Sequence, residues 1–109
     1  MRFGNVADLQ IYHDGTDSRI ANDTGSLIIS DTNGNIALQA KIGEESVKCI
    51  SDGSVELFFD NNKKIETTSS GVSVTGTVSA TGAITTSNNL NVNGGTATIV
   101  GSAPKIVFT

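Results

Sequence analysis

The sequence predicts an all-β fold built from short, repetitive strands. No stretch shows the apolar spacing of i, i+3, i+4 and i+7 that is typical of an amphipathic helix. Instead, short alternating runs recur, and each is closed by a Gly, Asn-Gly, Asp-Gly or Thr-Gly turn. The polar residues are mostly Ser, Thr, Asn, Gly and Asp, which disfavour helices because they compete for the backbone or prefer turns.

The apolar runs place the strands in order along the chain. Strands are predicted at 8–13, 19–21, 27–29, 36–40, 47–50, 55–59, 64–67 and 72–75. Turns are predicted at Asp14-Gly15, 22–25, Asn33-Gly34, Gly43, Asp52-Gly53 and 60–62. The glycines expected to make obligate turns are Gly15, Gly25, Gly53 and Gly71. The side chains expected in the core are Leu9, Ile11, Leu27, Ile29, Val55, Leu57, Val72 and Val74.

A comparison of the chain with itself shows two copies of one unit, at about 8–30 and 54–75. An offset of 46 residues places Leu9, Ile11, Tyr12 and Asp14 opposite Val55, Leu57, Phe58 and Asp60. Beyond the turn the offset becomes 45, which places Ile20, Leu27 and Ile29 opposite Ile65, Val72 and Val74. The slip of one residue lies in the turn, where insertions are tolerated. Each unit is therefore predicted to be strand, tight turn, strand, turn and strand, within a first region that spans 1–75.

The region 76–109 has a different composition, rich in Thr, Gly and Asn. Its apolar residues are small and sparse, so a strand here buries only one modest side chain at every second position. It is expected to continue the first region as a shaft stacked on copies of itself. The end of the sequence, 104–109, is predicted to be a strand with nothing after it, which suggests that the chain is a fragment of a longer polypeptide.

Composition limits the class of protein. The chain has 109 residues, only 5% aromatic residues and no Trp. A hydrophobic core formed within one chain would therefore be small, and we expect apolar side chains to be buried between chains. The net charge of −4 argues against a nucleic-acid partner. A single cysteine, Cys49, forms no internal disulfide. No apolar run approaches 18 residues and no signal-peptide pattern opens the chain, so neither membrane insertion nor export is predicted.

Two segments resemble a known family. Residues 8–15, DLQIYHDG, resemble a segment that recurs in tail-fibre and other virion appendage proteins of tailed bacteriophages, especially marine ones. Residues 55–68, VELFFDNNKKIETT, resemble the companion run VELYYDNxKKxETT of the same family. The departures are small, with Phe58 and Phe59 where tyrosine is commoner and Ile65 where phenylalanine is commoner. The resemblance covers roughly the first 76 residues.

The resemblance implies an elongated homotrimer on the virion, made in the host cytoplasm. Its strands would form a β-prism or an intertwined β-helix-like fibre segment whose core is shared by three chains. The expected function is structural and not enzymatic, without a cofactor. A stiff rod would position receptor-binding elements for host attachment, and a host cell-surface glycan or protein would be bound through a distal tip.

No catalytic set can be completed within one chain. His13 is the only histidine in the sequence. In a trimer, three copies of His13 could meet on the axis and hold a metal ion. A histidine that faces solvent or caps a turn is the favoured interpretation. Asp31 and Asn33 resemble half a calcium loop, but Ile36 stands where that loop needs glycine, so a hairpin turn is favoured. Glu44 and Glu45 are adjacent, so as a strand pair they would not converge on one substrate, and a solvated loop is favoured.

An alternative function is the binding of a glycan. Tyr12, Phe58 and Phe59 could form a stacking platform for sugars, which would make the chain a glycan-binding module of a phage or bacterial surface adhesin. Their recurrence at the repeat offset favours a packing role. Cys49 lies between Lys48 and Ile50 in a predicted strand and is interpreted as a small buried hydrophobic residue. A polysaccharide depolymerase would need carboxylate pairs between chains.

Overall fold

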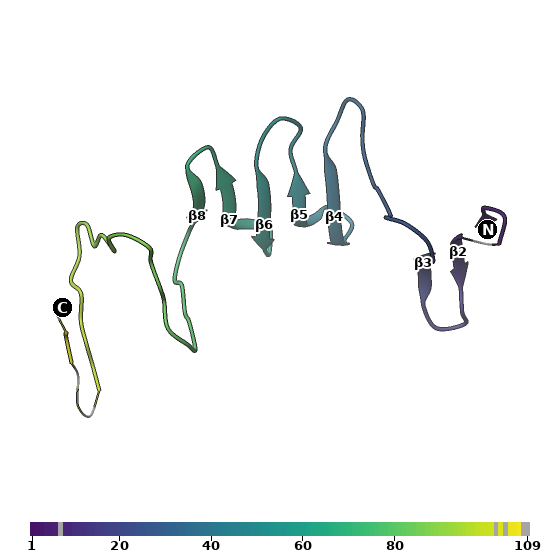
Figure 1. Cartoon of the computed structure of the whole chain (residues 1–109). Coiled ribbons are helices and arrows are strands. Elements are labelled where there is room, and N and C mark those ends of the chain that lie inside the picture. Colours follow the sequence, from purple (N-terminus) through teal and green to yellow (C-terminus); the bar gives the residue numbers. More distant parts are fainter. Residues whose placement is uncertain (7, 102, 104, 108–109) are drawn as a thin grey trace. The chain divides into compact units, whose positions relative to one another are not determined.

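A computed structural model describes residues 1–6, 8–101, 103 and 105–107, and it is all β, as predicted. The described residues form no helix, and the chain divides into two units, Met1–Thr77 and Val78–Thr109. The strands are β1 (Arg2–Phe3), β2 (Leu9–His13), β3 (Ser18–Asn22), β4 (Ile36–Lys41), β5 (Glu44–Cys49), β6 (Val55–Phe59), β7 (Asn62–Thr68) and β8 (Gly71–Val74) (Figure 1).

The first three strands make one antiparallel sheet in the order β1-β2-β3. Within it, Ile11 lies opposite Ile20 and Tyr12 lies opposite Arg19. The short strand β1 was not predicted from the sequence. It forms because Phe3 pairs with Leu9, and because the amino terminus of Met1 donates a hydrogen bond to the Ile11 carbonyl at 2.6 Å.

The other five strands form a second sheet in the order β4-β5-β6-β7-β8. Every neighbouring pair is antiparallel, so the sheet is a meander of consecutive hairpins. The turns follow the chemistry of their residues, since Asp60 and Asn61 both adopt positive φ, of 48° and 57°. Two left-handed residues in a two-residue loop are the requirement of a type I′ turn, and Asn and Asp tolerate that conformation better than most residues.

The four predicted turn glycines do not all act in the same way. Gly15, Gly25 and Gly71 have positive φ, of 101°, 66° and 149°. At the turn between β5 and β6 the left-handed residue is Asp52, with φ of 52°, and not Gly53. Gly53 is needed for space instead, because a Cβ there would lie 2.9 Å from Cγ2 of Ile50.

Three predictions about elements were wrong. Residues 27–29 do not form a strand, although Leu27 and Ile29 occupy the positions of Val72 and Val74 in β8. Glu44 and Glu45 lie in β5 and not in a solvated loop. The part of the predicted strand 104–109 that the structure describes, 105–107, is not a strand, and 104, 108 and 109 lie outside the described residues.

The second unit differs from the first in its local structure. The part of Val78–Thr109 that the structure describes consists of turns, bends and irregular backbone, without a strand. Its aliphatic side chains are exposed, including Val78, Ile84 and Leu90. An isolated copy therefore provides these apolar side chains with no packing partner, in keeping with the sparse apolar pattern of this region.

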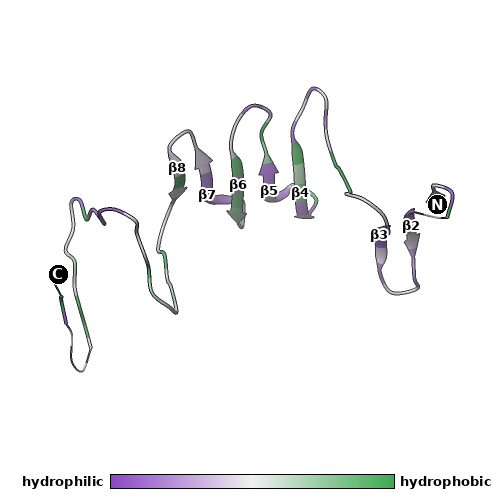
Figure 2. Ribbon diagram, viewed as in Figure 1, coloured by the Kyte–Doolittle hydropathy of each residue, from purple (hydrophilic) through white to green (hydrophobic). Residues whose placement is uncertain are grey.

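No residue that the structure describes is buried, whether apolar or polar. Apolar residues nevertheless recur along the strands, as the hydropathy colours of the ribbon show (Figure 2). In β6, for example, Val55, Leu57 and Phe59 alternate with Glu56 and Phe58. Because alternate residues of a strand point to opposite faces, the five-stranded sheet has two chemically different faces. A sheet with one apolar face and no layer on it lacks the second layer that domains normally have.

Candidate functional site

The candidate site is the apolar face of the five-stranded sheet. Residues directly opposite each other in neighbouring strands lie on the same face. The register of the sheet therefore joins side chains into a first row that crosses all five strands: Leu38, Val47, Leu57, Ile65 and Val74. A second row runs beside it: Ile36, Cys49, Val55, Thr67 and Val72. We call these two rows the apolar face.

The apolar face is uncovered in the single chain. Leu57, at the centre of the first row and flanked by strands on both sides, is still 39% exposed. Val72, near the edge of the sheet, is 65% exposed. Fully burying one such aliphatic side chain contributes roughly 1.5–3 kcal/mol. Covering a face of two rows would therefore stabilise this sheet substantially.

The predicted core residues of the second repeat all lie on this face. Val55 and Leu57 come from β6, and Val72 and Val74 come from β8. Leu38, Val47 and Ile65 were not among the predicted core residues, because their place on this face depends on the strand register. Alternation within each predicted strand was the signal that could have found them.

The predicted core residues of the first repeat are arranged differently. Leu9 and Ile11 share one face of β2, and Ile11 lies opposite Ile20 of β3. Leu27 and Ile29 lie outside any strand and are exposed, at 47% and 62%. The structure therefore joins only part of the first repeat into a common face.

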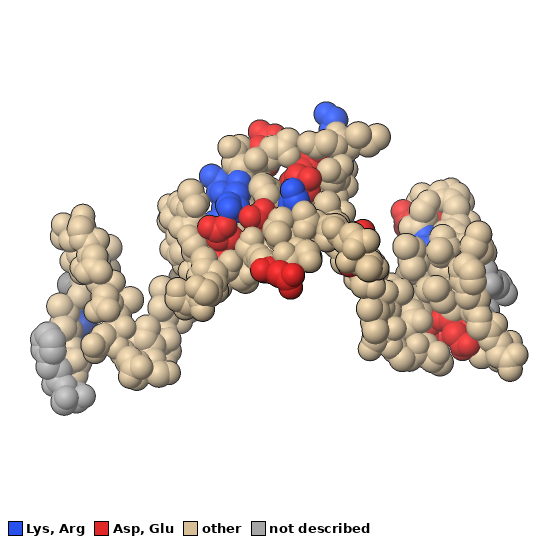
Figure 3. Space-filling view, turned by 90° about the horizontal axis from the view of Figure 1, so that it is seen from above, with Lys and Arg blue, Asp and Glu red and all other residues tan. Residues whose placement is uncertain are grey.

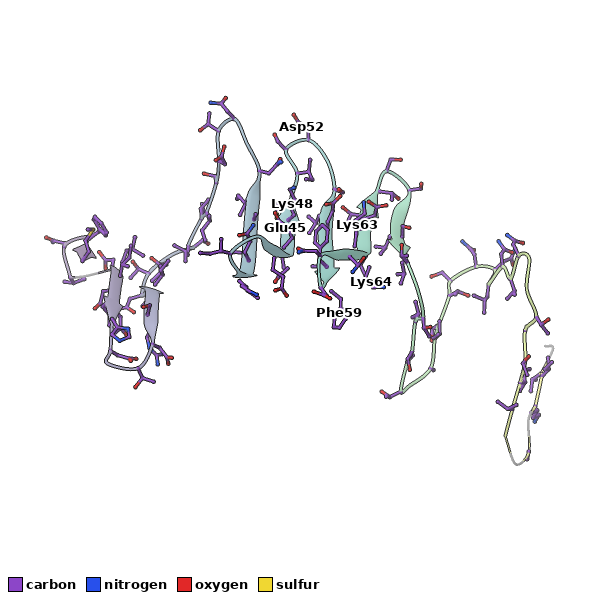
Figure 4. The ribbon with its side chains drawn as sticks, turned by 180° about the vertical axis from the view of Figure 1, so that it is seen from behind. Glu45, Lys48, Asp52, Phe59, Lys63 and Lys64 are labelled. Atoms are coloured by element: carbon purple, nitrogen blue, oxygen red, sulfur yellow. The ribbon has the colours of Figure 1, made fainter. Side chains whose placement is uncertain are left out.

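The opposite face of the five-stranded sheet is polar. A row of Ala37, Lys48, Glu56, Glu66 and Ser73 crosses it. Acidic and basic side chains lie together on this part of the surface (Figure 3), and the lysines of β5 and β7 are labelled in Figure 4. Charged groups of both signs on one face and aliphatic groups on the other are typical of a sheet with one solvated side.

Lys63 holds together two carboxylates that face each other. Glu56 lies directly opposite Glu66, and like charges in that position destabilise a sheet. The Lys63 ammonium bonds to Glu56 Oε1 at 3.2 Å and also to Glu66 Oε2. A hydrogen bond from Lys63 lowers the pKa of Glu56, and hydrogen bonds to Glu66 and Glu56 raise the pKa of Lys63. This cluster was not found in the sequence, because it depends on a β-bulge beside Phe58 that sets the register of Lys63.

Asn61 connects two neighbouring hairpins. Its side-chain Oδ1 accepts a hydrogen bond of 2.8 Å from the Glu45 backbone N–H, and its Nδ2 donates one of 3.3 Å to the Gly43 carbonyl. These contacts extend β5 back to Glu44, so the acidic pair lies in a strand. Glu45 Oε1 accepts a hydrogen bond from Gln39 Nε2 at 3.3 Å, so its carboxyl is engaged by a neighbouring strand and not by Glu44.

The aromatic residues considered for glycan contact lie in two separate sheets. Tyr12 is in β2, opposite Arg19, and is 43% exposed. Phe58 is in β6, half-buried, and opposite Lys63 on the edge of the charged cluster. The most exposed aromatic ring near this region is that of Phe59, at 73%, and it projects from the end of β6 (Figure 4).

His13 and Asp31 both act within local turns. His13 Nδ1 lies 3.3 Å from Ser18 Oγ across the hairpin. Asp31 Oδ1 accepts hydrogen bonds from the backbone N–H groups of Asn33 and Gly34, and these bonds lower the pKa of its carboxyl. This turn precedes β4, but no strand lies on its other side, so it is not the predicted hairpin.

No three His, Cys, Asp or Glu side chains among the described residues are placed to share a metal ion. None of the described segments is a helix that is long and apolar enough to span a membrane. Cys49 is a half-buried free thiol on the apolar face, so the expectation of a buried residue is not met within a single chain.

Comparisons with protein-family models, curated proteins and solved structures found no match to this chain.

Proposed function

We propose that this chain is a structural segment of a phage tail fibre or similar virion appendage, assembled as a homotrimer. Its role would be mechanical, since a stiff rod positions receptor-binding elements for attachment to the host. The observation that carries the proposal is the uncovered apolar face of the five-stranded sheet, in a chain whose described residues include none that is buried. Such a face is stable in water only when another layer covers it.

A second copy of the same chain is the simplest layer to supply. Each copy would present the same two aliphatic rows, so identical faces could pack around a common axis into a thin shared core. The polar face, with Lys48, Glu56, Lys63 and Glu66, would remain in contact with water. The number three and the location on a virion come from the resemblance of 8–15 and 55–68 to tail-fibre proteins.

The proposed role needs no enzymatic activity. The sequence offers one histidine, and the structure places the adjacent acidic pair in a strand, where neighbouring side chains point to opposite faces. The acidic net charge of −4 also favours a protein assembly over nucleic-acid binding.

The proposal is tested by placing the same charge on either face of β4. Leu38→Asp puts a carboxylate in the apolar face, whereas Ala37→Asp puts one on the polar face, opposite Lys48. Because a buried, unpaired carboxylate is costly, Leu38→Asp should reduce the fraction of assembled chains at least tenfold. Ala37→Asp should assemble like the wild type, as measured by size-exclusion chromatography with light scattering. Equal assembly of the two variants would contradict the proposal.

A further inference from the structure

An exposed apolar segment lies between the two sheets in the sequence, at 26–30. It contains Leu27, Ile28 and Ile29, which are 47%, 80% and 62% exposed. Leucine and β-branched isoleucine suit strands, yet this segment pairs with no strand in the single chain. Three consecutive exposed apolar residues are unusual on a finished surface and indicate a missing partner.

The internal repeat identifies the partner that this segment fits. In the second copy, the equivalent residues form β8, which adds to β7 with Val74 opposite Ile65 and Val72 opposite Thr67. The same offset pairs Ile29 with Ile20 and Leu27 with Asn22, both in β3. In the three-stranded sheet β3 contacts only β2, so its other edge is unpaired. An unpaired edge exposes backbone donors and acceptors that can accept a further strand.

The chain's own turn opposes this pairing. The Asn22 side-chain Nδ2 donates hydrogen bonds to the carbonyls of Thr24 and Gly25, at 2.8 and 3.1 Å. In the second repeat Thr67 stands at this position and has no amide to make such bonds. Side-chain bonds to nearby backbone compete with the ladder of a hairpin. In the single chain, Ile29 instead lines an open hollow together with Ile36 and Cys49, two residues of the five-stranded sheet.

We propose that residues 26–30 of one copy add as an antiparallel strand to β3 of a second copy. Ile29 would lie opposite the second copy's Ile20, and Leu27 opposite its Asn22, in the register that β8 shows on β7. The pairing extends the apolar row from Ile11 through Ile20 to Ile29. If each copy donates a strand to the next, a ring of three places every 26–30 segment on a β3 edge and leaves no β3 edge unpaired. This proposal rests on the self-association proposed above.

The geometry of β7 and β8 indicates a crosslink that tests this register. The Thr75 N–H donates to the Lys64 carbonyl at 2.8 Å, so the neighbouring pair Ile65 and Val74 is a non-hydrogen-bonded pair. Cα atoms in such a pair lie about 4.5 Å apart, which is within the range of a disulfide. The equivalent pair, Ile20 and Ile29, should therefore form a disulfide readily if the proposed strand exists.

The experiment uses the full chain with Cys49→Ser, so that only introduced thiols react. The double variant Ile20→Cys, Ile29→Cys is oxidised mildly and separated on a denaturing gel without reductant. We expect most chains to migrate as covalent dimers and trimers that reductant converts to monomers. As a second readout, a tagged chain with Ile20→Cys is assembled with an untagged chain carrying Ile29→Cys, and a mixed covalent dimer is expected.

Two controls make the outcomes distinct. Ile65→Cys with Val74→Cys should give a disulfide within one chain. Ile20→Cys with Ile28→Cys should give at least tenfold less crosslink between chains than Ile20→Cys with Ile29→Cys, because Ile28 would point to the other face of the strand. The native mass of each variant, with reductant but without denaturant, is measured first. Monomers there would contradict the proposed function. Assembled chains whose Ile20 and Ile29 cysteines link only within one chain, or no better than the Ile28 control, would overturn the strand exchange alone.

Discussion

The two copies of the repeat share an apolar rhythm but form different hairpins. In the first, β2 and β3 are joined by four residues, 14–17, between His13 and Ser18. In the second, β6 and β7 are joined by Asp60 and Asn61 alone, and a bulge adds one residue to β7. The shorter loop and the bulge together explain why the sequence offset changes from 46 to 45 residues.

The loops differ because different residues stabilise them. In the first hairpin the Asp14 carboxylate accepts hydrogen bonds from the backbone N–H groups of Thr16 and Asp17 and bonds to Arg19 at 2.5 Å. In the second, two left-handed residues make the turn directly. The sequence predicts a turn at Asp14-Gly15, and the structure has a longer loop of four residues there because the Asp14 carboxylate organises it.

The two hairpins also differ in their neighbours. The pair β6 and β7 lies between β5 and β8, whereas β2 and β3 are flanked only by the two-residue strand β1. The two hairpins have the same apolar pattern but pack differently. Both β6 and β7 have a neighbouring strand on each side, whereas β3 has a neighbour on one side only. The comparison shows that the repeat specifies a hairpin, while its sequence context decides how many strands join it.

The largest expected effect comes from truncating equivalent residues of the two hairpins. Leu57→Ala removes a side chain that has Val47 and Ile65 on its two sides, whereas Ile11→Ala removes one that lies beside Ile20. We expect Leu57→Ala to lower the free energy of unfolding of the assembly by about 2–3 kcal/mol per chain, and Ile11→Ala by about 1 kcal/mol. Urea denaturation at fixed chain concentration measures both, and a larger loss for Ile11→Ala would refute this ranking.

A smaller effect is expected at the turn of the second hairpin. Asn61→Ala removes two hydrogen bonds to the neighbouring hairpin and places alanine at φ of 57°, with an expected loss of about 2 kcal/mol. Asn61→Gly removes the same hydrogen bonds but tolerates the backbone, so its loss should be about 1 kcal/mol. Thermal unfolding of both variants measures the difference, and equal losses would mean that the left-handed conformation is not needed.

The smallest effect is a pH dependence confined to the first hairpin. Hydrogen bonds from the backbone of Asp17 and Thr16, and from Arg19, lower the pKa of Asp14 below its ordinary value of 3.8. Since the folded pKa is lowered, the stabilisation is present above pH 3.8 and is lost as the pH falls through the lower folded value. The amide signals of Thr16 and Asp17 should titrate in NMR with a midpoint below 3.8, and Asp14→Asn should abolish that step. A midpoint at or above 3.8 would show that the turn does not hold the carboxylate.

The hairpins were predictable from the sequence because they depend on local information. Alternating aliphatic residues and short turns rich in Gly, Asn and Asp marked β2, β3, β4, β6, β7 and β8 within a few residues of their ends. The apolar face was only partly predictable, since its rows depend on bulges beside Leu38 and Phe58 that set the register. A pattern along one strand cannot show which residue lies opposite in the next.

The errors have local physical causes as well. Residues 27–29 have the composition of a strand, but the Asn22 amide holds the carbonyls of the preceding turn. Glu44 and Glu45 have the composition of a loop, but Asn61, distant in sequence, fixes their backbone in β5. In both cases one asparagine side chain outweighs the local preference of the segment.

The mass of the assembled wild-type chain tests the central claim most directly. Size-exclusion chromatography with light scattering, or native mass spectrometry, measures it without any substitution. We expect three times the 11.2 kDa mass of one chain, together with a β-rich circular dichroism spectrum. A stable, β-rich species at 11.2 kDa would contradict it, because the apolar face would then be folded in water without a partner chain.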